Sequence, residues 1–92
     1  MIVRWAPGAR DDRAAIWEYV AADDPRAAAR LDEEFSRAAA ALADFPTMGR
    51  SGLIAGTREL FPVPRYRLVY EAVDEEIRIL ALVHTSRRWP GR

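Results

Sequence analysis

The alternation of hydrophobic and polar residues is clearest near the C-terminal end of the chain. Tyr66, Leu68 and Tyr70 alternate with other residues and share one side of an extended segment, which predicts a strand with one wet face. An acidic turn follows, and then the run 77–83 is apolar almost throughout. That run is typical of a central strand covered on both faces, so the stretch predicts a β-hairpin that leads into a polar cluster beginning at His84.

Two helices are predicted before this hairpin. Pro7 suits the first position of a helix that continues over residues 9–22, because the N–H that proline lacks would have no partner there. Residues 23–25, Asp-Asp-Pro, end this helix and start a second one with an aspartate N-cap followed by proline. Because the connection is short, the two helices are expected to run antiparallel.

Each predicted helix has one apolar side. In the first helix, Ile16, Tyr19 and Val20 share a side. In the second helix, apolar residues recur at spacings of three and four: Ala28, Leu31, Phe35, Ala38, Leu42 and Phe45. This stripe is typical of helix–helix packing, and its simplest role is in the core, although part of it could serve a partner helix.

The remaining segments complete the predicted fold. Residues 2–5 form a short opening strand, residues 46–52 a glycine-containing turn, and residues 57–61 a strand whose regular ladder is interrupted at Pro62 and Pro64. The predicted order is β-α-α-β-β-β. This order indicates an α+β fold, with a small, mostly antiparallel sheet and an N-terminal helical hairpin packed on one face.

Composition limits the kinds of function. Ninety-two residues are enough for one core, so residues 1–92 are expected to form a single domain. With no cysteine and one histidine, the sequence favours neither a disulfide framework nor a zinc or iron site, and no cofactor is expected. No apolar run has the length of a signal peptide or of a membrane span, so a cytoplasmic protein without a membrane partner is expected.

Charge is distributed unevenly along the chain. Residues 1–46 contain six arginines and nine acidic residues, a net charge of −3, whereas residues 47–92 contain eight arginines and five acidic residues, a net charge of +3. All fourteen basic residues are arginine, whose planar guanidinium suits phosphate and carboxylate partners. An anionic partner is therefore expected to meet the C-terminal half.

The residues best suited to chemistry lie at the end of the last strand. His84 is the side chain whose ordinary pKa suits proton transfer near neutral pH, and Arg67, Arg87 and Arg88 supply nearby positive charge. Structural roles compete with these: His84 could cap backbone groups or pack against an aromatic ring, and Arg67 could pair with Glu59 across the sheet.

The sequence also suggests structural roles for several other side chains. Arg50 is expected to hydrogen-bond to loop carbonyls, Trp17 is either a partner anchor or the rim of the core, and Trp89 is expected to fold back onto the body. The acidic run 32–34 is most simply a solvated helix face.

Several short motifs, in order, resemble the RelE/ParE superfamily of toxins from bacterial toxin–antitoxin pairs. They are Trp5 with Ala9-x-x-Asp12, Phe45-Pro46-x-Met48-Gly49-Arg50, Gly56-Thr57-Arg58-Glu59-Leu60, Tyr66-Arg67-Leu68-Val69-Tyr70, Ile77-x-Ile79-Leu80, and His84-x-x-Arg87 followed by Trp89-Pro90. The resemblance covers essentially the whole chain. One departure is Arg13, at a position that is commonly apolar in the superfamily, where its aliphatic stem is expected to cover apolar surface.

The resemblance implies a toxin that is held inactive by an antitoxin wrapped around it. An apolar groove between the helical hairpin and the sheet, beside an arginine-rich surface, would accept an amphipathic and acidic antitoxin segment that folds on binding. Members of the superfamily divide between RelE-type mRNA endonucleases, which act on the ribosome, and ParE-type inhibitors of DNA gyrase.

In the RelE-type interpretation, Arg67 and Arg87 resemble catalytic arginines and His84 is the candidate acid or base. Arg58 would replace another basic residue, but Leu60 stands where a second is expected, and the C-terminal tyrosine of several RelE-type enzymes is missing.

The ParE-type interpretation rests on three features that resemble the ParE branch. These are the long helical hairpin, the turn with Met48 to Arg50, and the ending from His84 to Arg87. The candidate binding residues are Arg50, Arg58, Arg65, Arg88 and Trp89. The leading hypothesis is therefore a gyrase inhibitor, with an mRNA endonuclease and a non-toxic antitoxin-binding remnant as the alternatives.

Overall fold

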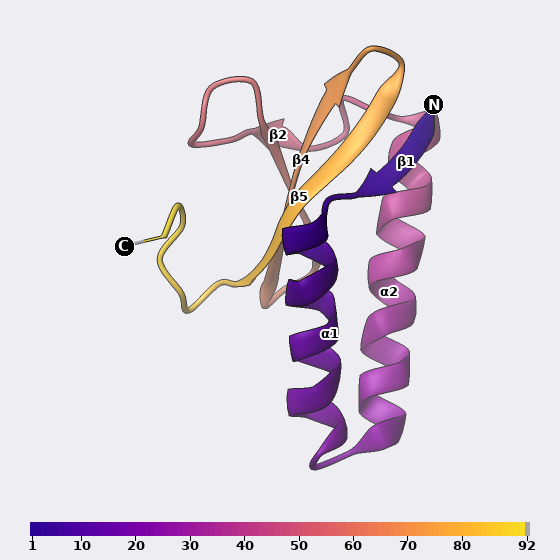
Figure 1. Cartoon of the computed structure of the whole chain (residues 1–92), viewed down its shortest axis with the longest axis vertical. Helices are drawn as coiled ribbons and strands as arrows, with labels where there is room; N and C mark the ends of the chain where they lie inside the picture. The colour runs from indigo at the N-terminus through magenta and orange to yellow at the C-terminus, as the bar shows by residue number, and fades with distance from the viewer. Residues whose placement is uncertain (92) are drawn as a thin grey trace.

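The structure is a computed structural model that describes residues 1–91, and Arg92, the last residue of the predicted tail, lies outside them. Two helices follow a short strand, and four strands complete the chain (Figure 1). The elements are β1 (Ile2–Trp5), α1 (Pro7–Ala21), α2 (Pro25–Asp44), β2 (Arg50–Ser51), β3 (Arg58–Val63), β4 (Tyr66–Val73) and β5 (Glu76–His84). The predicted α+β fold is confirmed, and β2 is an addition to the predicted order.

The five strands form one mixed sheet in the order β1-β5-β4-β3-β2. The strands β2 to β5 pair antiparallel with their neighbours, whereas β1 pairs parallel with β5. A parallel pair needs a long crossover connection, and here the helical hairpin supplies the first part of it. As predicted, β5 lies inside the sheet, between β1 and β4. The irregularity expected near Pro62 is present as a register shift between Leu60 and Val63 in the pairing of β3 with β4.

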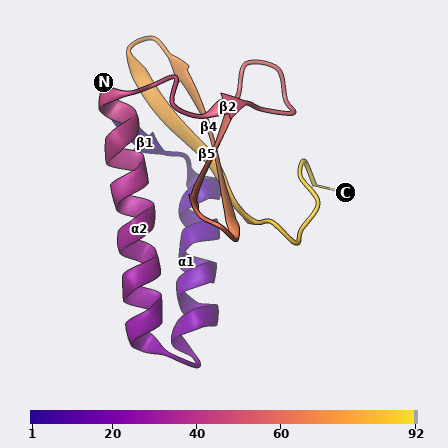
Figure 2. The same cartoon turned by 180° about the vertical axis from the view of Figure 1, so that it is seen from behind.

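The ends of both helices follow the local signals in the sequence. Pro7 and Pro25 occupy the first helical positions, and the side chain of Asp24 accepts hydrogen bonds from the backbone N–H groups of Arg26 and Ala27, each at 3.1 Å. The connection is three residues long, and the helices run antiparallel side by side (Figures 1 and 2). The far end of the hairpin extends beyond the sheet along the long axis of the molecule.

The hydrophobic core lies between the helical hairpin and one face of the sheet. Its largest fully buried side chains are Phe35 and Leu42 from α2 and Leu68, Tyr70, Ile77 and Ile79 from the sheet. Phe35 also packs edge-on against Tyr66, with ring centroids 5.4 Å apart. Because no helix within residues 1–91 covers the opposite face, the prediction that β5 is covered on both faces is only partly correct: Arg78 and Leu80 retain exposed surface.

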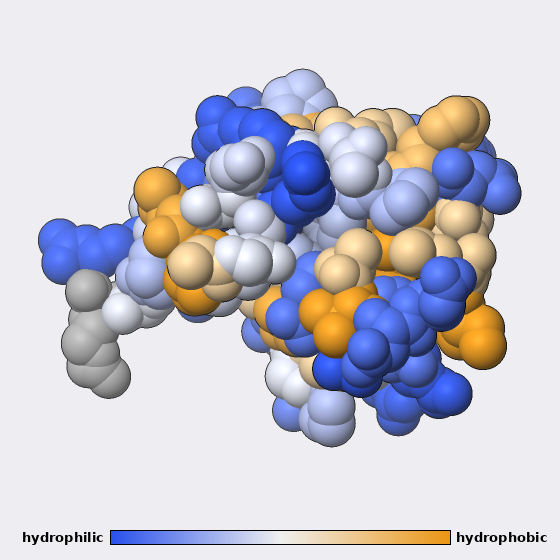
Figure 3. All heavy atoms as spheres, turned by 90° about the horizontal axis from the view of Figure 1, so that it is seen from above, coloured by the Kyte–Doolittle hydropathy of each residue, from blue (hydrophilic) through white to orange (hydrophobic). Residues whose placement is uncertain are grey.

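Two aromatic residues of the predicted apolar stripes lie outside the core. Tyr19, in the last turn of α1, is 82% exposed, and Figure 1 shows that this end of α1 extends past the sheet. Phe45 is 64% exposed, because α2 ends at Asp44 and the following backbone leaves the helical direction. Seen from the end where the chain begins, hydrophobic side chains form small groups among charged ones rather than one continuous field (Figure 3).

Arg13 joins the two helices. Its guanidinium approaches both carboxylate oxygens of Asp32, at 2.6 and 2.9 Å, and donates to the Ser36 hydroxyl at 2.6 Å. The same guanidinium lies 4.6 Å from the ring centroid of Trp5. The local adjustment expected at Arg13 is therefore an ion pair between helices, and Asp32 is not simply part of a solvated face.

Charged side chains also link the parallel strands. Glu76 at the start of β5 accepts from Arg78 at 2.9 Å and from Arg4 of β1 at 3.0 Å. These two hydrogen bonds, with that from Arg78 the larger influence, hold the pKa of the Glu76 carboxyl below its usual value. The turn before it has only two residues, Asp74 and Glu75, both with positive φ, so Glu76 belongs to the strand rather than to the predicted turn.

Within residues 1–91, no helix combines the length and apolar character that crossing a membrane requires.

Candidate functional site

A charged cluster lies on the sheet face that the helices leave open. Glu59 of β3 is its centre, with a side chain only 1% exposed. Arg67 Nε lies 3.1 Å and Arg50 Nη2 3.4 Å from Glu59 Oε1, and the Leu53 N–H donates to Oε2 at 3.3 Å. The predicted pairing of Arg67 with Glu59 is thereby confirmed, and two arginines share one buried carboxylate.

The pairing with Glu59 does not satisfy all the hydrogen-bond donors of the Arg67 guanidinium. Its side chain is only 15% exposed, and within residues 1–91 the buried Nε has no aligned hydrogen-bond acceptor, although Glu59 is close. Arg67 and Arg50 also lie over the ring of Phe61, at 5.7 and 4.9 Å from its centroid. We call Glu59, Arg67, Arg50 and Phe61 the open-face cluster; with two guanidinium groups and one carboxylate, it carries a formal charge of +1.

A second set of contacts holds the loop between α2 and β2. The buried Tyr70 hydroxyl accepts from the Gly49 N–H at 2.9 Å and donates to the Pro46 carbonyl at 2.8 Å. A Cβ on Gly49 would lie 2.8 Å from the Tyr70 ring and 2.9 Å from a backbone oxygen of Glu59, so this position has no space for a side chain. Arg58 Nη1 donates to the Gly49 carbonyl at 2.8 Å. The loop-carbonyl role predicted for Arg50 is therefore wrong, and Arg58 has it.

His84, at the end of β5, has both of the structural contacts considered for it. Its Nδ1 accepts a hydrogen bond from the Ser86 N–H at 3.0 Å, and its ring packs edge-on against Tyr66 with centroids 5.1 Å apart. This contact uses Nδ1 as the acceptor nitrogen of the ring and leaves Nε2 as the other polar atom of the side chain.

Strand pairing places Arg67 and His84 on opposite faces of the sheet. Tyr66 is paired with His84 and Arg67 with Val83, and directly paired residues in an antiparallel ladder share a face. Tyr66 contacts Phe35 of α2, so the His84 side is the helical face. The sheet itself therefore separates the Arg67 guanidinium from the His84 imidazole.

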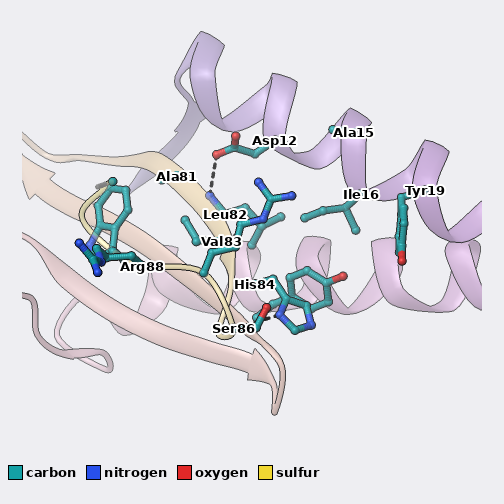
Figure 4. A pocket seen from close by; sticks show the side chains of 14 residues that line it. Asp12, Ala15, Ile16, Tyr19, Ala81, Leu82, Val83, His84, Ser86 and Arg88 are labelled. Carbon is teal, nitrogen blue, oxygen red and sulfur yellow. Dashed lines mark hydrogen bonds between the residues drawn. The ribbon is translucent and has the colours of Figure 1, made fainter.

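A groove of about 780 Å³ lies between α1 and the second half of β5 (Figure 4). Its lining includes Ile16 and Tyr19 from α1 and His84 from β5. The tail adds Arg87, Arg88 and Trp89. The groove thus combines apolar side chains with two exposed arginines.

The groove follows a strand edge that is only partly closed. The last residue of β1 is paired with Ile79, and beyond this pair no strand from the described part of the chain lies beside β5 on that side. Asp12 of α1 accepts a hydrogen bond there from the Leu82 N–H at 3.0 Å, and the His84 carbonyl accepts from the Arg87 N–H at 2.9 Å. Along a strand, the backbone N–H and carbonyl groups of every second residue point to the same edge. The Leu82 carbonyl and the His84 N–H therefore face the same edge of β5 as the Leu82 N–H.

The other candidate residues occupy different places. Arg65 is exposed in the turn between β3 and β4, and its carbonyl accepts from the Thr85 N–H at 2.8 Å. Trp89 is half-buried, as expected for a tail that folds back, and among the described residues its buried indole nitrogen has no hydrogen-bond partner. The candidates therefore divide between the open-face cluster, the groove, the loop between α2 and β2, and the turn between β3 and β4.

Sequence reasoning missed the parts played by Asp12 and Phe61. Asp12 supplies an acceptor to a strand 70 residues away, which no local pattern signals. Phe61 could have been noticed, because it shares the alternation of Glu59 in β3 and therefore its face.

The chain matches one family model, described as "ParE toxin of type II toxin-antitoxin system, parDE", over residues 3–89. It is 34% identical over 88 residues to "Putative toxin Y4kP" of Sinorhizobium fredii, which covers 96% of this chain and 92% of that protein. It is also 35% identical over 85 residues to "Toxin RelE2" of Caulobacter vibrioides, which covers 92% of this chain and 96% of that protein.

Solved structures share the fold. A chain of the "Chromosomal ParDE TA system from P. aeruginosa" superposes with a TM-score of 0.80 at 23% identity, covering 91% of this chain and 95% of that chain. The "YoeB/ParE toxin from Agrobacterium tumefaciens" superposes with a TM-score of 0.64 at 18% identity, covering 91% of this chain and 98% of that chain.

Proposed function

This chain belongs to the family of ParE toxins of type II toxin–antitoxin systems, and we propose that it acts by binding and inhibiting DNA gyrase. Membership of this family implies a cognate antitoxin as a partner. The toxin is proposed to act in the cytoplasm, where both partners would be found.

The separation of Arg67 from His84 is the observation that carries this proposal. An RNA endonuclease must bring a proton-transfer group and a cation to the same phosphate, within hydrogen-bond reach of the reacting atoms. Here the two candidate groups lie on opposite faces of the sheet. Arg67 is also paired with buried Glu59, and His84 Nδ1 is occupied by the Ser86 N–H. A toxin that acts by binding gyrase does not need these two groups to meet at one phosphate.

The groove between α1 and β5 is proposed as the antitoxin-binding site. Ile16 and Tyr19 offer apolar contact on one wall, and Arg87 and Arg88 offer positive charge on the other. This combination suits an amphipathic and acidic segment that becomes ordered on binding. Replacing Tyr19 with alanine and Arg88 with glutamate should each weaken the complex with antitoxin, measured by titration calorimetry.

The alternative function, ribosome-dependent mRNA cleavage, has one observation in its favour. His84 and Arg87 both line the groove, so a proton-transfer group and a cation do meet there without Arg67. The similarity to a protein named RelE2 also keeps this alternative open. A non-toxic remnant that only binds antitoxin is the third outcome that an experiment must distinguish.

The experiment is induced expression without antitoxin, with pulse labelling of DNA and of protein synthesis in the same culture. The wild-type chain is compared with His84→Ala and Arg87→Ala. Arg30→Ala is the matched control, because Arg30 is an exposed arginine of α2 that lines neither the groove nor the open-face cluster. Each variant is first shown by circular dichroism to fold.

Gyrase inhibition predicts an early fall in DNA synthesis while translation continues, with His84→Ala still toxic. An early fall in translation that His84→Ala and Arg87→Ala abolish, but Arg30→Ala does not, would make the chain an endonuclease. Growth unaffected by the wild-type chain would indicate the remnant.

A further inference from the structure

The open-face cluster has an exposed apolar neighbour. Leu53 donates its N–H to the central carboxylate of Glu59, so its backbone borders the cluster, and its side chain is 69% exposed. Phe61 is 38% exposed, and the guanidinium groups of both arginines lie over its ring. We infer that the open-face cluster together with Leu53 binds an acidic surface of the target protein. This inference rests on the proposed function, and it identifies the surface that contacts gyrase.

The cluster is organised before any partner arrives. Glu59 is buried and holds both Arg67 and Arg50 near one oxygen, and the ring of Phe61 lies under both guanidinium groups. Side chains fixed in this way lose little conformational entropy on binding. Arg50 remains 65% exposed, so its guanidinium can also donate to a carboxylate of a partner.

Charge and composition both indicate a protein partner. Two guanidinium groups share a single carboxylate, so an acidic partner would complete the charge balance. Arginine and aromatic residues are the types that contribute most to protein–protein binding energy, above all where exposed apolar groups surround them. Leu53 and Phe61 supply the apolar part here.

Nucleic acid is a weaker candidate for this surface. Cleavage would need a proton-transfer group beside the arginines, and the imidazole of His84 lies on the other face. The carboxylate of Glu59 is buried and already contacts three donors. Binding of RNA without chemistry would favour a row of cations along its backbone rather than a compact aromatic centre.

Arg67 of the cluster lies on β4, next to the strand that borders the antitoxin groove, but Arg50 and Phe61 lie farther away, on β2 and β3. The groove borders β5, whereas Arg50 lies on β2, three strands away in the sheet order. At about 4.8 Å per strand, this separation is about 14 Å. Because of this separation, substitutions at Arg50 and Phe61 should leave antitoxin binding unchanged. A large target could still be excluded by an antitoxin bound in the groove.

The test compares Arg50→Glu, Arg50→Ala and Phe61→Ala with the control Arg30→Glu, which makes the same charge change on α2. Each purified toxin is assayed for inhibition of DNA supercoiling by gyrase and, separately, for affinity to the antitoxin. We expect Arg50→Glu to raise the half-inhibitory concentration at least about tenfold, with Arg50→Ala and Phe61→Ala raising it less. Antitoxin affinity should stay within about twofold for all variants, which also shows that they fold.

Other results overturn the inference and separate it from the proposed function. If the wild-type chain inhibits gyrase and all three variants inhibit it equally well, the target surface lies elsewhere and gyrase inhibition stands. If the wild-type chain leaves gyrase active, the proposed function fails, and the inference fails with it. In that case, loss of binding to a fluorescent single-stranded RNA in Arg50→Glu, but not in Arg30→Glu, would assign the surface to nucleic acid.

Discussion

Replacing Tyr70 with phenylalanine tests how the loop between α2 and β2 is held. The substitution keeps the buried ring and removes only the hydroxyl, which accepts from the Gly49 N–H at 2.9 Å and donates to the Pro46 carbonyl at 2.8 Å. Tyr70 is fully buried and Gly49 is buried too, so bulk solvent has little access to the N–H that loses its acceptor. The Pro46 carbonyl keeps some access to solvent.

The expected loss of stability follows from these contacts. An unsatisfied buried donor costs about 1–3 kcal/mol, and the half-buried carbonyl should add little because water can reach it. We therefore expect Tyr70→Phe to lower the free energy of unfolding by about 2 kcal/mol. For a domain of this length each kcal/mol corresponds to about 4–8 °C, so Tm should fall by about 8–16 °C.

The assay is urea unfolding followed by circular dichroism, on toxin refolded after separation from its antitoxin. Tyr19→Phe is the matched control, because Tyr19 is 82% exposed, and its variant should stay within about 0.5 kcal/mol of wild type. A loss below about 0.5 kcal/mol for Tyr70→Phe would refute the reasoning, since the two hydrogen bonds could not then hold the loop.

Three further substitutions test the ends and edges of the sheet. Asp12→Ala should lower the free energy of unfolding by about 1–2 kcal/mol in the same urea assay, because the Leu82 N–H loses its acceptor at the partly closed edge of β5; an unchanged midpoint would contradict this. Glu75→Gly should raise it by about 0.5–1 kcal/mol, because the residue has a φ of 62° that glycine adopts without strain, and a lower midpoint would count against that view of the turn. Glu76→Gln should destabilise the protein at pH 7, because the hydrogen bond from Arg78 lowers the folded-state pKa of this carboxyl. Because the folded-state pKa is lowered, the Glu76 carboxylate stabilises the fold at pH values above its unfolded-state pKa of about 4.3. This stabilisation is lost as the pH falls through the folded-state pKa, so the difference in stability between Glu76→Gln and wild type should shrink in acid. A difference that does not depend on pH would refute the prediction.

The local parts of the fold could be predicted from the sequence. The start of α2 is determined by Asp24 and Pro25, and the antiparallel hairpin follows from the short connection, so neighbouring residues were sufficient. The exposure of Tyr19 was not predictable from the periodicity of α1. It depends on how far the helix extends past the sheet, and helical periodicity shows which residues share a side but not what covers it.

The site was less predictable because it depends on contacts between distant segments. The pairing of Arg67 with Glu59 could be inferred from neighbouring strands, and it is present. The separation of Arg67 from His84 depends on the register of β4 against β5, which includes a shift between Val69 and Tyr70. Sequence alone gave no register and therefore placed both residues in one region.

Gyrase supercoiling in the presence of the purified wild-type chain is the most direct test of the central claim, that this toxin acts by binding gyrase. The assay uses relaxed plasmid, gyrase and ATP, with a translating extract and a reporter mRNA run in parallel at the same toxin concentrations. We expect supercoiling to stop, to recover when equimolar antitoxin is added, and the mRNA to remain intact. Full supercoiling beside an mRNA cut only on the ribosome would contradict the account.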